Sequence, residues 1–451
     1  MKHTKKKWSR KLKRMILSAL ALTALLVAVI AIPAYASNGL AAYISAQIRQ
    51  GAIGIFTFLI IIVPALVYFF SRARHGNERG LWSTAIVFTL LCALSIGSIW
   101  YMEMKRSPDE GIGENLRMIH DESDIKDLME SQTTAARQAG SPLPLFIPTG
   151  VFVQSVEFVN GNNVVLTGYI WQRYSKQIPA EVARGFVMPE GDVIEGSEAY
   201  RIQQGDEEVI GWYIQTTLRQ LFDYTRYPFD RQDIWLRLWH KDFARNVVLV
   251  PDFAGYQITT WDPFANLGLE KDFVWERLIL ERTYFNYHYN SYNTNFGINN
   301  YVGQNEFPEL YYNIGVRRDA LDAFVAYLIP LLILVLMAFG VQFIITQVPE
   351  KIGLYGITTT GLIAYFASLF FIGILSQLDI RRTLNAPGVV YLEYFYFTLY
   401  IILLLQTVNA IIFIISDNVH FLEFKDNLYP KVIFFPITFG VMFIITATVF
   451  F

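Results

Sequence analysis

The chain has 451 residues, of which 53% are hydrophobic, 16% are aromatic and only 17% are charged. Charged residues make up about a quarter of a soluble protein of this size, so the composition predicts a membrane protein. The formal net charge of -2 argues against a nucleic-acid-binding surface, and the single cysteine, Cys92, excludes an intrachain disulfide framework and any multi-cysteine metal site.

Several apolar stretches are long enough to cross a hydrocarbon core of about 30 Å, which needs roughly 20 helical residues. They are residues 15–33, 53–70, 81–101, 323–345, 354–375, 394–415 and 432–451. The first follows a basic segment and precedes Ala34-Tyr35-Ala36, so residues 1–36 are either a signal peptide or a first membrane anchor. In both cases the basic end is cytoplasmic, residues 37–101 form a transmembrane hairpin, and the polar block that follows is extracytoplasmic.

The polar block divides into two parts. Residues 102–142 are charged and poor in aromatic side chains, with Ile125 and Leu128 at helical spacing, which predicts a helical linker. In residues 143–318, short β-branched or alternating runs are separated by Gly, Asn, Asp and Pro, and Asn160-Gly161 is a hairpin signal. About eight to ten strands in this pattern predict a β-sandwich. A four-helix transmembrane domain follows at residues 319–451.

Three short sequences mark the β-region and its junction with the helices. Residues 227–232 are Tyr-Pro-Phe-Asp-Arg-Gln, residues 168–174 form an earlier strand with a Trp at its centre, and Arg317-Arg318 precede a helix that contains Pro330. With the order of elements, these sequences resemble the pentameric ligand-gated ion channels. Residues 227–230, the Pro-loop, resemble the family's aromatic-Pro-aromatic-Asp loop at the membrane end of the sandwich.

The resemblance covers residues 143–451 and implies a homopentamer of the prokaryotic type, because the two cysteines that flank the Pro-loop in animal members are missing. It implies a bacterial inner membrane, a periplasmic β-domain and a ligand- or proton-gated channel that is permeable to cations. The N-terminal hairpin has no counterpart in the minimal family. Two alternatives remain open, a non-conducting receptor that signals through a partner, and a periplasmic binding module anchored by its last four helices.

The resemblance also implies a coupling site at the junction, formed by Pro228, Asp230, Arg318 and Arg381. Asp230 and Arg318 are expected to be neighbours, and a partly buried, charge-assisted pair there would transmit movement of the sandwich to the helices. The alternative is a static salt bridge. Arg381, with Arg382, is expected in the outer loop after the fifth span, beneath the Pro-loop, or alternatively in contact with lipid headgroups.

A ligand site is implied at residues 283–292, where the family carries a hairpin that caps its ligand. Tyr284, Tyr287 and Tyr289 offer flat apolar faces with polar tips, which suit a cationic or small amphipathic ligand. Trp171 and Tyr174 of a neighbouring subunit are expected to complete an aromatic box. The alternative is that these side chains belong to strand edges or subunit contacts.

The fifth span is expected to line the pore, because an apolar helix conducts ions only if one stripe is small or hydroxylated. Such a stripe passes through Gly353, Thr360 and Ala367. Thr360 is the expected polar ring, Ile363 a hydrophobic constriction, and Glu350 a carboxylate ring at the inner mouth that favours cations. The alternative is a packed helix that never conducts.

Catalytic motifs are missing from the sequence: it has no Gly-rich phosphate loop, no His-Glu-x-x-His and no nucleophile elbow. We therefore expect no enzymatic activity. His240, Asp242 and His288 are separate residues rather than a ligand set, so we expect no metal or other cofactor, although such residues could titrate near neutral pH. The expected partners are further copies of the chain, the lipid bilayer, a small ligand or protons, and permeating ions, with no nucleic acid.

Overall fold

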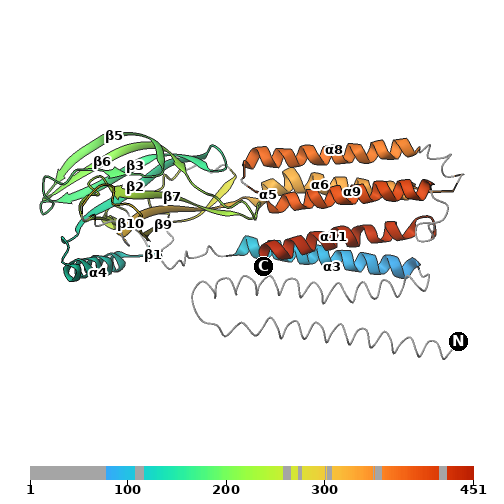
Figure 1. Ribbon diagram of the computed structural model, residues 1–451, viewed down its shortest axis with the longest axis horizontal. Coiled ribbons are helices and arrows are strands. Elements are labelled where there is room, and N and C mark those ends of the chain that lie inside the picture. The colour runs from blue at the N-terminus through green and yellow to red at the C-terminus, as the bar shows by residue number, and fades with distance from the viewer. Residues whose placement is uncertain are drawn as a thin grey trace, which may run out of the picture.

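The computed structural model places a β-region and a bundle of long helices end to end (Figure 1). The predicted spans at 15–33 and 53–70, with the signal-peptide alternative, lie outside the described residues. The structure describes residues 78–106, 116–256, 266–272, 277–299, 301, 307–348, 350, 358–386, 388–415 and 424–451.

The β-region consists of two five-stranded sheets in a sandwich-like arrangement, with the orders β1-β9-β10-β7-β4 and β5-β6-β3-β2-β8. Alternation of apolar residues produces the core, as on β3, where Val164, Leu166 and Ile170 are buried and their neighbours are partly exposed. The strands are β1 (Leu116–Ile119), β2 (Leu145–Phe158), β3 (Asn163–Ser175), β4 (Phe186–Val187), β5 (Gly191–Gln204), β6 (Glu207–Arg219), β7 (Arg231–His240), β8 (Val247–Pro251), β9 (Leu278–Asn290) and β10 (Phe307–Arg318).

The predicted helical linker contains both a helix and a strand. Helix α4 (Glu122–Ala139) begins at Asp121, whose side chain accepts hydrogen bonds from two backbone N–H groups, and ends at Gly140, which has a left-handed conformation. Strand β1 was not predicted from the sequence. It pairs antiparallel with β9 and covers that edge of the first sheet.

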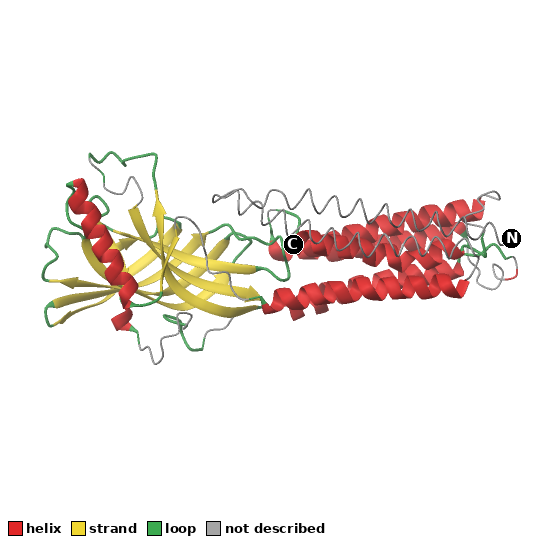
Figure 2. Ribbon diagram, turned by 90° about the horizontal axis from the view of Figure 1, so that it is seen from below, coloured by secondary structure: helices red, strands yellow, loops and turns green. Residues whose placement is uncertain are grey.

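In the part of the chain that the structure describes, five helical segments are long and apolar enough to cross a membrane, which makes this a membrane protein. They coincide with the predicted spans from residue 81 onward. Figure 2 shows the strands and these helices as two bodies joined end to end. The helices are α3 (Glu78–Lys105), α5 (Ala320–Ala323), which continues through a π-helical turn (Phe324–Leu328) into α6 (Ile329–Ile344), α8 (Thr359–Leu384), α9 (Tyr391–Ile415) and α11 (Leu428–Phe450).

Helix α8 ends later than the predicted span at 354–375. Thr358 caps its N-terminus by accepting a hydrogen bond from the Gly361 N–H, and Asn385 ends it in a left-handed conformation. Arg381 and Arg382 therefore lie in the last helical turn, where cations interact favourably with the helix dipole. The prediction that they lie in a loop was wrong, because charged residues can extend a helix beyond its apolar part.

Helix α3, which coincides with the predicted span at 81–101, packs along α11 (Figure 1). Their contact is close in the middle of both helices, where the Phe88 ring lies against Gly440 and a Cβ at that glycine would be 3.6 Å from it. The described bundle thus contains one helix more than the predicted four-helix domain.

Candidate functional site

The Pro-loop lies where the sandwich meets the helices. Phe229 is buried, and its ring centroid lies 5.9 Å from that of Trp100, 5.8 Å from Phe324, 6.5 Å from Tyr391 and 5.6 Å from Phe450. These four rings come from α3, the π-helical turn between α5 and α6, α9 and α11. One side chain of the sandwich is therefore in contact with most of the helical bundle.

Asp230 and Arg318 form a buried ion pair beside Phe229. Arg318 donates from Nε to Oδ1 at 2.9 Å and from an Nη to Oδ2 at 3.1 Å, and the Asp230 side chain is only 1% exposed. The Arg318 backbone N–H also donates to the Asp230 carbonyl, and its guanidinium lies 5.0 Å from the centre of the Tyr227 ring. Burial disfavours the charged guanidinium, but the facing carboxylate outweighs burial and raises the pKa of Arg318.

Arg381 lies in the last turn of α8 and does not contact the Pro-loop through any described interaction. Its Nε donates to the carboxylate of Glu393 at 2.6 Å, which joins α8 to α9, and Gln377 donates to the same oxygen at 3.1 Å. The expected position beneath the Pro-loop is taken by the start of α9. The Tyr391 backbone N–H donates to the Thr225 carbonyl at 2.9 Å.

The β2–β3 turn is a second contact between the sandwich and the helices. A Cβ at Gly161 would lie 2.5 Å from the carbonyl oxygen of Asn385, the residue that ends α8. Only glycine fits this close approach of two backbones. The hairpin signal Asn160-Gly161 thus marks a turn that rests on the end of α8.

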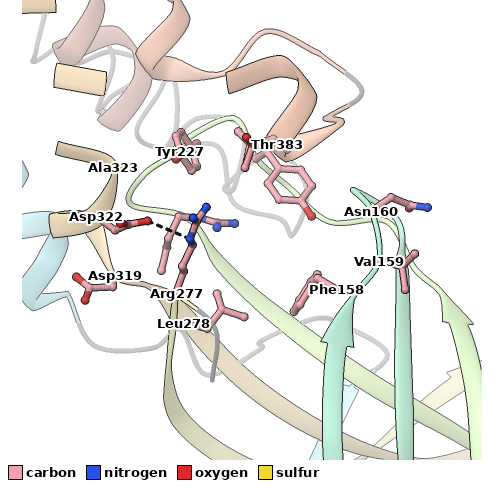
Figure 3. Close-up of a pocket in the computed structure, with 13 residues that line it drawn as sticks. Phe158, Val159, Asn160, Tyr227, Arg277, Leu278, Asp319, Asp322, Ala323 and Thr383 are labelled. Carbon is pink, nitrogen blue, oxygen red and sulfur yellow. Dashed lines mark ion pairs between the residues drawn. The ribbon is translucent and has the colours of Figure 1, made fainter. Parts of the chain in front are cut away.

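A cavity of about 520 Å³ opens between these two contacts (Figure 3). Its walls come from the β2–β3 turn, the Pro-loop and its flank, the starts of β9 and α5, and the end of α8. Arg277 and Asp322 form an ion pair of 3.3 Å across one side of it. The junction is therefore only partly packed, which leaves space for the sandwich to move relative to α8.

At the end of the sandwich away from the helices, aromatic rings of the β9–β10 connection gather with rings at and after the end of β7. Trp239 lies 5.9 Å from Phe243, 5.7 Å from Tyr292 and 6.1 Å from Phe296, and Tyr301 lies 5.5 Å from Phe296. We call these five residues the aromatic cluster. Only Tyr292 fell within the ligand site implied by the sequence. The other four were not singled out, because they come from the end of β7, the turn after it and the long β9–β10 connection, whose folding could not be read from spacing.

The aromatic cluster already holds a cation of the protein itself. The guanidinium of Arg237 lies 4.9 Å from the Trp239 ring centre and 5.9 Å from that of Tyr292. It pairs with Glu190 at 2.7 Å and with Glu309 at 2.8 Å. The cluster therefore combines aromatic faces with carboxylates, an arrangement that favours positive charge.

The aromatic box expected from the sequence is not formed within the subunit. Residues 283–290 belong to β9 rather than to a hairpin tip, and Tyr284 and Tyr287 are buried in the sandwich, where the Tyr287 hydroxyl donates to a backbone carbonyl at 2.7 Å. Tyr174 is also buried, and Trp171 donates to Asp252 at 2.7 Å. Burial in the core takes Tyr174, Tyr284 and Tyr287 out of the expected box, whereas Trp171 is partly exposed and its place at a contact with a neighbouring subunit stays a prediction.

Tyr289 is the remaining member of the expected box. It is partly buried near the end of β9 and packs against the hydrophobic core. It is therefore placed with the sandwich and not in the aromatic cluster.

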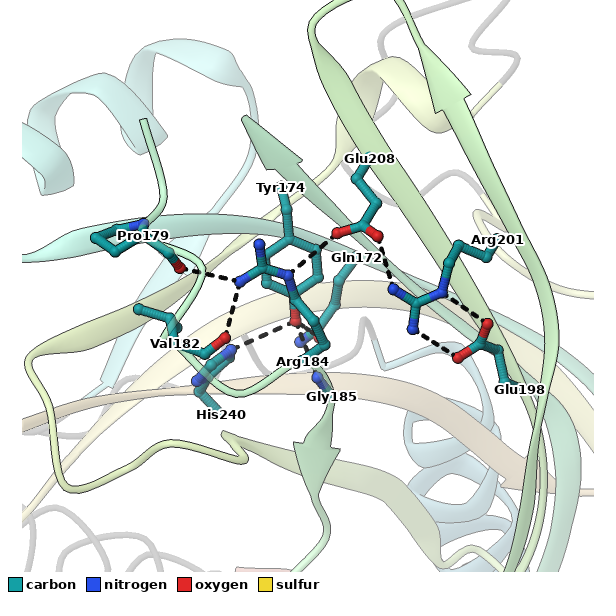
Figure 4. Close-up of polar contacts among 10 residues, drawn as sticks. All are labelled: Gln172, Tyr174, Pro179, Val182, Arg184, Gly185, Glu198, Arg201, Glu208 and His240. Carbon is teal, nitrogen blue, oxygen red and sulfur yellow. Dashed lines mark hydrogen bonds and ion pairs between the residues drawn. The ribbon is translucent and has the colours of Figure 1, made fainter. Parts of the chain in front are cut away.

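A buried polar network surrounds Tyr174 (Figure 4). Its hydroxyl donates to Gln172 at 2.5 Å, accepts from the Gly185 N–H at 2.9 Å, and lies 3.4 Å from Nε2 of His240. The Arg184 guanidinium covers the ring at 4.3 Å. Burial lowers the pKa of His240 from 6.5 to about 4.

The pKa of His288 is lowered by burial, as is that of His240. The His288 ring stacks on Tyr311 at 3.9 Å, and burial lowers its pKa to about 4. The expectation that these histidines could titrate near neutral pH was therefore wrong, because desolvation keeps both rings neutral there.

The lowered pKa of His240 predicts that acid destabilises the sandwich. The unfolded chain takes up the proton near pH 6.5 and the folded protein only near about pH 4, so stability is lost as the pH falls through this interval. The loss approaches about 3 kcal/mol at 1.36 kcal/mol per pKa unit. Thermal unfolding at about pH 7 and about pH 4.5 should show that His240→Gln loses less stability on acidification than the unmodified protein.

Exposed His120 supplies the control, since a His120→Gln variant should retain the full acid sensitivity. Equal loss of stability on acidification in the His240→Gln variant and the unmodified protein would contradict the assignment.

The predicted pore residues lie on the open side of α8. Thr360, Ile363 and Ala367 are exposed in the subunit, and the Ile363 side chain is 41% exposed. Thr360 lies in the first turn of α8. Glu350 is also exposed, and Gly353 lies outside the described residues.

Within the described ranges, no group of three or more His, Cys, Asp or Glu residues could hold a metal ion. No protein-family model matches the sequence, and a search of curated proteins finds no significant match.

Proposed function

We propose that the protein is a homopentameric ligand- or proton-gated ion channel of a bacterial inner membrane, permeable to cations, with its sandwich in the periplasm. The observation that carries this proposal is the low burial of α8. Only 22% of its most apolar stretch is buried in the subunit, compared with 44% for α11. Lipid could cover an apolar face, but the exposed face of α8 also carries Thr360, Ala364, Ala367 and Ser368.

Five copies of α8 would enclose a pore that one copy cannot form. At 100° per residue, Thr360, Ala367 and Phe371 fall within about 40° of one another on the helix. Phe371 is 61% exposed in the subunit. A ring of five such side chains would add a second hydrophobic constriction, outward of the one expected at Ile363, and narrow the pore by dewetting.

The aromatic cluster is the sensor site that we propose in place of the box expected from the sequence. The faces of Trp239 and Tyr292 suit a cationic or small amphipathic ligand, as their contact with Arg237 illustrates. The indole N–H of Trp239 is buried without a hydrogen-bond partner among the described residues, so it could donate to such a ligand. The low pKa values of His240 and His288 favour a ligand over protons at this end of the sandwich near neutral pH.

The proposal predicts current, and Ile363→Ala tests it. Removing the apolar side chain from the constriction should give larger or constitutive current in planar-bilayer recordings during pH steps and calcium removal. Ile372→Ala is the matched control, because Ile372 is exposed on the opposite side of α8. Silence from all three proteins, with pentamers shown at the membrane surface, would contradict conduction and support a non-conducting receptor.

A further inference from the structure

The outer end of α3 reaches the same junction as the Pro-loop. The ring centroid of Trp100 lies 5.9 Å from that of Phe229, 5.2 Å from Phe324 and 6.4 Å from Phe395. Its indole N–H donates to the Tyr391 hydroxyl at 2.8 Å. Trp100 thus lies between the Pro-loop and two helices of the bundle and is bound to both sides.

Polar contacts of α3 hold the Pro-loop from both flanks. On the N-terminal flank, Glu103 pairs with Arg226 at 3.3 Å, and the Glu103 side chain is only 11% exposed. On the C-terminal flank, Arg231 donates to the backbone carbonyl of Arg106. The last turn of α3 and the residue after it therefore contact the residues immediately before and after the loop.

The remainder of α3 is fixed to the bundle. Phe88 packs against Gly440, and Trp82 stacks on Phe343 of α6 at 6.3 Å. Tyr391, which accepts the Trp100 hydrogen bond, also binds Thr446 of α11 at 2.7 Å. A displacement of α3 relative to the bundle would therefore disturb the contacts at Trp100 and Glu103, and with them the Pro-loop.

We propose that Trp100 and Glu103 are positioning residues, which hold the Pro-loop on the helical bundle and set how readily it moves. The inference rests on the proposed function for its consequence, because the loop is where the sandwich would drive the pore. It assigns to α3 a role that packing alone does not require: a membrane helix outside the four-helix domain controls the coupling loop directly.

The ion pair of Glu103 and Arg226 offers a direct test, since its two charges can be exchanged. Glu103→Arg places a third cation beside Arg226 and Arg106, which both pair with Glu103, at 3.3 Å and 3.5 Å, and should release the N-terminal flank of the loop. Arg226→Glu should do the same with two carboxylates. The combined variant places opposite charges at positions 103 and 226 again, in reversed order, so it should restore most of the contact that holds the loop. If the single variants acted only by loss of packing, their effects on exchange would add in the combined variant.

The measurement is hydrogen–deuterium exchange of the full chain in detergent, followed in peptides that cover residues 223–231. Each single variant should accelerate amide exchange there by about tenfold. The combined variant should return most of the way to the unmodified rate, with the remainder due to Arg106, which then faces a cation at position 103. Leu94→Ala is the matched control: it shortens an exposed side chain on the same helix and should leave exchange in this segment unchanged. Trp100→Phe, which keeps a ring but loses the indole donor, should show a smaller acceleration than Trp100→Ala.

Unchanged exchange in the Glu103→Arg variant, additive effects in the combined variant, or equal acceleration by Leu94→Ala would each overturn the proposal. Exchange does not depend on current, so a failure here is distinguishable from a failure of the channel hypothesis. Where the protein conducts, the two single variants should also change the current after a pH step, and the combined variant should reverse that change.

Discussion

We expect an Arg318→Ala variant to lose about 3–5 kcal/mol of stability at the junction, because it leaves the buried carboxylate of Asp230 without its cation. Asp230 receives two hydrogen bonds from Arg318 and a third from Gln232 at 3.0 Å. Gln232 alone cannot compensate for the lost charge. The loop would then shift or take up water. Under the proposed function, the stimulus that evokes current from the unmodified protein should no longer do so.

Thermal unfolding in detergent and current recording measure the two effects of Arg318→Ala. The double variant Asp230→Asn with Arg318→Gln removes both charges and should recover most of the stability, because no unpaired charge remains. If it recovers stability without current, the ion pair has a role in coupling beyond its structural role. Arg317→Ala is the control, since Arg317 is partly exposed and pairs with Glu281 at 3.5 Å. A loss from Arg317→Ala as large as that from Arg318→Ala would contradict this account.

The second large effect is expected from Arg381→Ala. Its partner Glu393 is 1% exposed, so the variant leaves a buried carboxylate with hydrogen bonds from Gln377 and the Val390 N–H at 3.0 Å but without a cation. The cost should be about 3 kcal/mol, at the low end of the range for a broken buried pair, because these two donors remain. The contact between the C-terminal end of α8 and the start of α9 should loosen.

The neighbouring Arg382→Ala variant is the control for Arg381→Ala. Arg382 is exposed in the same helical turn, so its removal should change the unfolding temperature little. Equal unfolding temperatures for the two variants would show that the Arg381–Glu393 pair does not stabilise the junction.

Several parts of the structure could be predicted because short-range signals determine them. Runs of apolar residues locate the five described membrane helices, and alternation with turn residues locates most strands of the sandwich. The neighbours Asp230 and Arg318 followed from a resemblance in local sequence. They lie together because β7 and β10 are paired, with Arg317 opposite Arg231.

Other parts depend on packing that no local pattern reveals. Tyr284 and Tyr287 resemble ligand-binding residues in sequence, but the pairing of β9 with β1 and β10 buries them. Arg381 looked like a loop residue because charge normally ends an apolar span, whereas its pair with Glu393 extends the helix. The contact of Trp100 with Phe229 joins residues that are far apart in the chain, and only the packing of α3 on α11 brings them together.

The central claim, that copies of α8 line a water-filled pore, is tested most directly by cysteine accessibility. Cys92 is the chain's single cysteine and is buried, so a Cys92→Ala background carries no other thiol. We predict that a cationic methanethiosulfonate reagent reduces the current of Ala367→Cys in this background and leaves that of Leu369→Cys, at a buried position of the same helix, unchanged. Current through Ala367→Cys that is unaffected by the reagent, while Ile372→Cys on the opposite side of α8 responds, would contradict the account.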